Sequence, residues 1–167
     1  MKATLSVALL CLLAGVVSCR ELQATTAPPS LQLPASCNAK YTCTGSGDQL
    51  YNCNGTRWVG TGSDVKLTCG SESGTYTYVS GTPTYKLGCG SVEGNAATQL
   101  RVTNPSNNPE DSTLYRRDAT AGSGCLSDIK YIARTEAKGG LPKDYSCPKS
   151  GDTARIPYSG SWEFLAC

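Results

Sequence analysis

Residues 49–59 read QLYNCNGTRWV, and this stretch decides the fold class. Two runs with strand-like side chains, Gln49–Cys53 and Thr56–Val59, flank the dipeptide Asn54-Gly55. Asn-Gly is the strongest short-range signal for a β-hairpin, because both residues tolerate the positive φ angles of a tight turn. The sequence therefore predicts a hairpin here, with Asn54 and Gly55 at its tip.

Further short β-rich runs follow along the chain, and Gly, Pro or Asn separates nearly all of them. No segment shows a helical apolar stripe of useful length. We therefore predict an all-β, disulfide-stapled β-sandwich or barrel with long irregular loops. The runs are Val65–Cys69, Thr75–Val79, Pro83–Leu87, Thr98–Thr103, Asp128–Thr135, Arg155–Tyr158 and Ser161–Leu165.

The N-terminal segment has the features of an export signal. Lys2 precedes an uncharged run rich in Leu, Val and Ala, which is short for a membrane span, and small residues lead up to Arg20. We expect a signal peptide over residues 1–19, a Pro/Thr-rich flexible spacer over 20–36, and one domain over 37–167. The alternative is a bacterial lipoprotein, anchored through a lipid on Cys19 rather than released. Both interpretations place the protein outside the cytoplasm.

The cysteine count supports an oxidising compartment. Of ten cysteines, Cys11 and Cys19 belong to the predicted signal, which leaves an even set of eight. Four disulfides are the expected arrangement, and 105 pairings are possible. The chain has no histidine, so we expect no zinc site and no other metal or cofactor. The eight residues are Cys37, Cys43, Cys53, Cys69, Cys89, Cys125, Cys147 and Cys167.

Several motifs resemble the secreted family known as domain of unknown function 3455, found in fungi, bacteria and lower plants. They cover most of the predicted domain. The usual histidine of that family is absent here, and cysteines are more numerous. The resemblance implies a secreted β fold without an established activity. The motifs are Gly47–Cys53 with Trp58, Pro83–Tyr85, Gly90–Val92, Tyr131–Thr135, Gly139–Pro142, Ile156–Tyr158 and Trp162–Phe164.

Catalytic chemistry has little support in this composition. Without histidine there is no Ser-His-Asp triad and no Cys-His pair, and we identify no catalytic residue. Hydrolysis by two carboxylates remains an alternative, because it needs only two acids at a suitable separation. The balance of 15 Lys and Arg against 13 Asp and Glu gives no indication of a nucleic-acid partner. The acids available are Asp48, Asp64, Glu136, Asp144 and Glu163.

Binding chemistry has more support. Nine Tyr and two Trp against one Phe form a polar-tipped aromatic set, suited to stacking on sugar rings. We favour a secreted, non-enzymatic protein of the wall or matrix that binds polysaccharide, with Trp58, Tyr76, Tyr78 and Tyr85 as candidate contacts. The alternatives are packing of these tyrosines in the core, a carboxylate-dependent glycan hydrolase, and a secreted effector or antimicrobial protein.

The sequon Asn54-Gly55-Thr56 predicts an N-linked glycan on Asn54 in a eukaryotic host. An unmodified turn is the alternative. The oligomeric state has no signal in the sequence.

Overall fold

The computed structural model describes residues 35–79, 81–102 and 114–167. The predicted signal peptide and residues 20–34 of the spacer lie outside them. The described part contains nine strands and one short 3₁₀ helix, Ala96–Thr98. The strands are β1 (Asn38–Cys53), β2 (Trp58–Cys69), β3 (Glu72–Val79), β4 (Thr82–Leu87), β5 (Gly90–Gly94), β6 (Leu100–Val102), β7 (Leu114–Gly124), β8 (Ile129–Gly139) and β9 (Thr153–Ala166).

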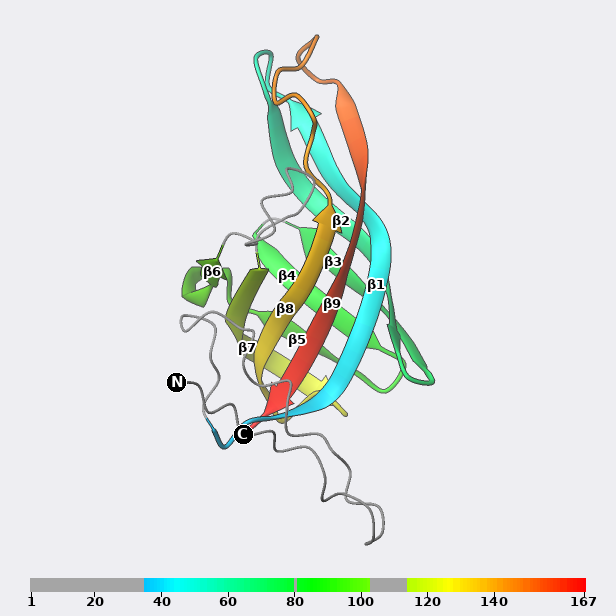
Figure 1. Cartoon of the computed structure of the whole chain (residues 1–167), viewed down its shortest axis with the longest axis vertical. Helices are drawn as coiled ribbons and strands as arrows, with labels where there is room; N and C mark the ends of the chain where they lie inside the picture. The colour runs from blue at the N-terminus through cyan, green and yellow to red at the C-terminus, as the bar shows by residue number, and fades with distance from the viewer. Residues whose placement is uncertain (1–34, 80, 103–113) are drawn as a thin grey trace, which may run out of the picture.

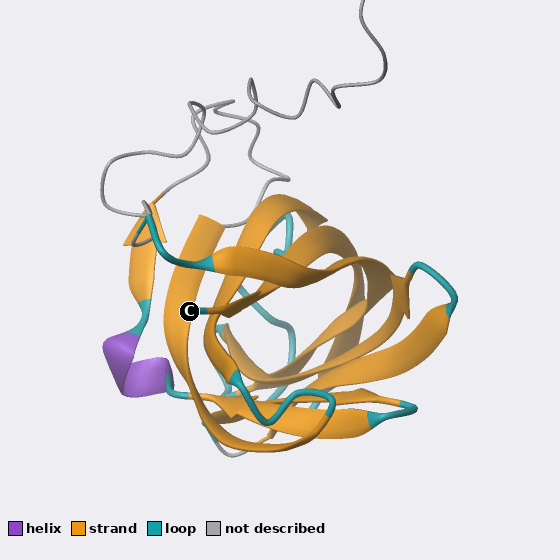
Figure 2. Ribbon diagram, turned by 90° about the horizontal axis from the view of Figure 1, so that it is seen from below, coloured by secondary structure: helices purple, strands orange, loops and turns teal. Residues whose placement is uncertain are grey.

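The strands form an antiparallel barrel. The all-β prediction is therefore confirmed, and of the two expected architectures, a sandwich or a barrel, the structure has the barrel. The sheet order is β5-β4-β3-β2-β1-β9-β8-β7-β6, and a further pairing of β5 with β7 closes a ring of eight strands. β6 pairs with β7 outside the ring. Within the ring, strands that follow one another in the sequence lie side by side (Figures 1 and 2). This is up-and-down topology, which leaves the ring no free edge.

The β1–β2 hairpin forms as predicted, but its loop is longer than a two-residue turn. β1 ends at Cys53 and β2 begins at Trp58, not at Thr56. The Asn54 side chain explains the difference: its Oδ1 atom accepts hydrogen bonds from the backbone N–H groups of Thr56 (3.1 Å) and Arg57 (2.9 Å). These bonds hold both residues in the turn. Gly55 adopts the positive φ that the dipeptide indicates, at 99°.

Aromatic side chains fill the barrel interior. Tyr85, Trp162 and Phe164 are fully buried. Tyr85 stacks on Tyr76 with ring centroids 4.8 Å apart and meets Phe164 edge to face at 5.3 Å. Such pairs add about 0.5–1.5 kcal/mol each to the free energy gained by burying their area. The interior of this small barrel is therefore a packed core.

One charged residue also lies in this interior. Arg134 on β8 is 7 % exposed, and its guanidinium donates a 2.5 Å hydrogen bond to the Tyr158 hydroxyl on β9. The same guanidinium carbon lies 5.5 Å from the centre of the Tyr158 ring. Ile132, two residues before Arg134 and fully buried, shares this inward face of β8.

Disulfides join all eight predicted cysteines, so the expected count is confirmed. Three of the bridges lie toward the end of the barrel where β9 finishes, and one lies at the opposite end. The pairs are Cys37–Cys167, Cys43–Cys69, Cys89–Cys125 and, at the opposite end, Cys53–Cys147.

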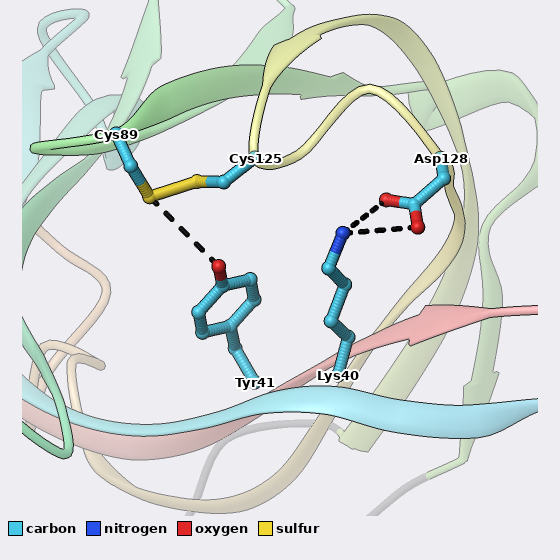
Figure 3. Close-up of polar contacts among 5 residues, drawn as sticks. All are labelled: Lys40, Tyr41, Cys89, Cys125 and Asp128. Atoms are coloured by element: carbon cyan, nitrogen blue, oxygen red, sulfur yellow. Dashed lines mark hydrogen bonds and ion pairs between the residues drawn. A yellow bond between two sulfur atoms is a disulfide. The ribbon is translucent and has the colours of Figure 1, made fainter.

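Figure 3 shows contacts that hold together the end of the barrel where β9 finishes. Cys89–Cys125 joins the β4–β5 turn to the β7–β8 turn, and the Tyr41 hydroxyl lies 3.9 Å from the Cys89 sulfur. The Lys40 ammonium donates to both carboxylate oxygens of Asp128, at 2.7 and 2.9 Å. The hydrogen bond from Lys40 is the main reason that the pKa of Asp128 is below its usual value. β1 is thus tied to the β7–β8 turn across this end.

Candidate functional site

The opposite end of the barrel carries a strap, which we define as residues 140–152, between β8 and β9 (Figure 1). It begins where the Gly140 N–H donates to the Pro157 carbonyl (2.8 Å). It then reaches β2, where the Trp58 N–H donates to the Tyr145 carbonyl (2.8 Å), and returns to β1 through a bond from the Gly151 N–H to the Cys53 carbonyl (2.9 Å). The Cys53–Cys147 disulfide fixes it to the hairpin.

Three polar-tipped aromatic residues gather under and on this strap. Cys53 pairs with Trp58 across the hairpin, and Tyr51 lies two residues before Cys53, so Tyr51 and Trp58 share the face that carries the disulfide. The Tyr51 hydroxyl donates to the Gly140 carbonyl at 2.5 Å. Tyr145, on the strap itself, is 54 % exposed. We call Tyr51, Trp58 and Tyr145 the strap cluster.

The electrostatics of the strap cluster favour neutral hydrogen-bonding groups. Burial raises the pKa of Tyr51 to about 12, and the nearby Tyr145 adds to that increase. The Tyr51 phenol therefore keeps its proton far above neutral pH and continues to hold the Gly140 carbonyl. Trp58 is partly exposed, and Tyr145 is largely exposed. An exposed aromatic face with polar tips is suited to stacking on a sugar ring.

The structure separates the four aromatic residues that the sequence grouped together. Tyr76 and Tyr85 are 4 % and 0 % exposed, and Tyr78 packs against the core beside them. Tyr76 and Tyr78 do share a strand face, as predicted, but that face is the barrel interior. Tyr76 and Tyr85 are therefore withdrawn as surface contacts, because ring-on-ring packing occupies them. Trp58 stays in the candidate site.

Two of the candidate carboxylates, Asp48 and Asp64, are joined by one arginine. Asp48 and Asp64 are cross-strand partners on β1 and β2. Arg155 lies between them and donates to Asp48 through Nε and to Asp64 through a terminal nitrogen, both at 2.9 Å. The guanidinium thus fills the space that a scissile bond would need. Glu136 accepts a hydrogen bond from Ser161 (3.0 Å), and the Asp144 carboxylate accepts one from the Ser146 N–H (2.9 Å).

Sequence reasoning missed Tyr51 and Tyr145 as members of the site. Tyr145 lies in the polar segment PKDYSC, which reads as a loop, and it is 87 positions beyond Trp58. The one signal that joins them is the Cys53–Cys147 bond, which is one of many pairings that the cysteine count allows.

Comparisons with protein-family models, curated proteins and solved structures find no match for the chain. Within residues 35–79, 81–102 and 114–167, no group of three or more His, Cys, Asp or Glu side chains is placed to hold a metal ion. Over the same ranges, no helix is long and apolar enough to cross a membrane.

Proposed function

We propose that this is an extracellular protein that binds an insoluble polysaccharide reversibly through the strap cluster and leaves it chemically unchanged. The observation that carries the proposal is the backbone hydrogen bond that places the partly exposed Trp58, at the start of β2, next to the exposed Tyr145 on the covalently fixed strap. Binding sites gain affinity when their aromatic groups are held rigid before the ligand arrives, because less conformational entropy is lost. The Cys53–Cys147 bond and the Tyr51–Gly140 hydrogen bond provide that rigidity.

Four disulfides support the extracellular location, since such bonds persist in oxidising compartments. The predicted export signal over residues 1–19 and the motif resemblance to the secreted family known as domain of unknown function 3455 support the same location. We propose release into the medium or wall, with a lipid anchor on Cys19 as the bacterial form.

The binding experiment compares the wild-type protein with Trp58→Ala and Tyr145→Ala in pull-downs on chitin, cellulose, glucan and pectin particles. Val79→Ala is the matched control, because Val79 is 64 % exposed on the β3–β4 hairpin and lies outside the strap cluster. We expect the wild type and the control to bind at least one particle. Both aromatic variants should lose most of that binding, because each stacked ring is replaced by a methyl group.

Reducing-end assays on the supernatants separate binding from hydrolysis. Steady release of new reducing ends, abolished by one Asp or Glu substitution, would show that the protein is a carboxylate-dependent hydrolase. Equal binding by Trp58→Ala and the wild type would refute the assignment to the strap cluster. Failure to bind any particle would favour the effector or antimicrobial alternative.

We also propose an N-linked glycan on Asn54 in a eukaryotic host. Asn54 is exposed on the hairpin loop, and its side-chain oxygen accepts bonds from Thr56 and Arg57. Expression in a eukaryotic secretory host should give one band that shifts on treatment with an N-glycosidase. Asn54→Gln and Thr56→Ala should each remove that shift, and a wild-type band that does not move would contradict occupancy.

A further inference from the structure

Two depressions lie next to each other on the outer wall of the barrel, over β1, β9 and β8. One has a volume of about 200 Å³ and the other about 350 Å³. Both include Lys138 on β8 and Ser159 on β9 in their walls, so they form one continuous outer groove. Both are shallow and open to solvent rather than enclosed, the larger more so. A ligand bound there would lie along the wall with part of its surface in water, as one or two linked sugar rings could.

The strand register explains which side chains line the groove. Thr44 on β1 pairs with Ser161 on β9, which pairs in turn with Glu136 on β8. In the next outward row, Ser46 pairs with Ser159 and Ser159 with Lys138. Cross-strand partners share a face, so these six side chains form two adjacent rows of three on the outside of the barrel.

The side-chain lengths give the groove its shape. Ser159 and Ser161 on the central strand are half-buried, whereas Glu136 and Lys138 on β8 are exposed. Short serine side chains thus lie at the centre, and two long charged side chains stand along one rim. Four hydroxyl groups, from Thr44, Ser46, Ser159 and Ser161, lie within this area, and most of the exposed lining around them is apolar.

The chemistry of the groove favours a neutral ligand with many hydroxyl groups. Serine and threonine hydroxyls both donate and accept hydrogen bonds, and sugar hydroxyls do the same. Lys138 adds donors and Glu136 adds acceptors, and Glu136 already accepts a 3.0 Å bond from Ser161. Lys138 and Glu136, the two charged residues in the lining, carry opposite charges. We propose that the outer groove is a second, independent binding site for a neutral mono- or disaccharide unit.

The test is a titration of the ¹⁵N-labelled secreted protein, followed by amide chemical shifts. The probes are cellobiose, maltose and N,N′-diacetylchitobiose, with digalacturonate as the acidic comparison. We expect at least one neutral disaccharide to shift amides within 44–46, 136–138 and 159–161. Ser159→Ala, which removes a central hydroxyl without adding bulk, should weaken that binding about tenfold.

Two control variants make the outcome decisive. Thr75→Val removes an exposed hydroxyl on β3, outside the groove, and should leave the affinity unchanged. Trp58→Ala should also leave the affinity unchanged. The experiment therefore tests binding in the groove separately from the polysaccharide binding proposed for the strap cluster. The proposal is overturned if no neutral disaccharide shifts these amides, if Ser159→Ala binds like the wild type, or if digalacturonate binds more tightly than every neutral probe.

Discussion

The ring of Trp162 on β9 lies directly against Gly45 on β1, and the contact leaves no room for a side chain on Gly45. A Cβ atom added to Gly45 would lie 2.8 Å from Cζ3 of Trp162 and 2.8 Å from Cδ2 of Leu67. Gly160, the cross-strand partner of Gly45, lies against the same ring. The largest core side chain thus occupies space that two paired glycines leave open, which fixes how closely β1 and β9 pack.

Gly45→Ala should therefore destabilise the barrel by about 1–3 kcal/mol, the usual cost of adding a methyl group to a filled core. The measurement is chemical denaturation monitored by Trp fluorescence. Gly60→Ala is the matched control, because a Cβ atom there would meet only Cε1 of Tyr51 at 3.7 Å, an ordinary contact distance. Equal losses in the two variants would contradict steric exclusion by Trp162.

Removal of the strap disulfide should loosen one end of the barrel. We expect the double variant Cys53→Ser/Cys147→Ser to lose about 2–4 kcal/mol of stability, because the unfolded chain gains freedom. Hydrogen exchange should be faster at the backbone amides of positions 58 and 147, which form hydrogen bonds between the hairpin and the strap. Cys37→Ser/Cys167→Ser, at the other end, should leave these two amides protected. Unchanged exchange in the first variant would mean that the disulfide does not hold the strap.

Alkaline pH should weaken the fold through Tyr51. Its pKa is raised from 10.0 to about 12 in the folded protein, so the folded state holds its proton more tightly than the unfolded chain does. The associated stability is fully present below pH 10 and is lost as the pH rises toward 12. Tyr51→Phe should show a shallower loss over this interval, measured by urea denaturation at each pH. Parallel curves for the two proteins would contradict the assignment.

Acidic pH should remove the coupling between Lys40 and Asp128. The pKa of Asp128 is lowered in the folded state, mainly by the hydrogen bond from Lys40, so this contribution is present above the usual pKa of 3.8 and disappears as the pH falls through the lowered value. A double-mutant cycle with Lys40→Met and Asp128→Asn should give a small coupling at neutral pH, since the pair is exposed, and none in strong acid. A coupling that persists in strong acid would exclude charge attraction as its source.

The strands with alternating or aromatic side chains could be predicted from the sequence, and those built on small residues could not. Tyr76 and Tyr78 marked β3 correctly, whereas β5 and β7 gave no signal. A Cβ atom on Gly90 of β5 would lie 2.2 Å from the Ser123 carbonyl oxygen of β7, so at this position the two backbones approach too closely for a side chain. The pairing that closes the barrel therefore depends on glycine, which carries no apolar pattern.

The candidate site was less accessible to sequence reasoning than the fold. Alternation placed Tyr76 on one strand face but could not say that Tyr85 would stack on it in the interior. Trp58 was identified for its residue type alone. Its neighbour Tyr145 is positioned by the Cys53–Cys147 bond and by a backbone hydrogen bond, and neither contact has a local sequence pattern.

The Cys37–Cys167 bond makes residues 37–167 a covalent ring. β1 and β9 already run side by side, and the bond joins the residues that flank them, 130 positions apart, with Cα atoms separated by 4.1 Å. One broken peptide bond within this ring opens it without releasing a fragment, and the two new ends stay on neighbouring strands. A circular permutant that links residues 37 and 167 and opens at the exposed β2–β3 turn would keep every strand pair of the barrel.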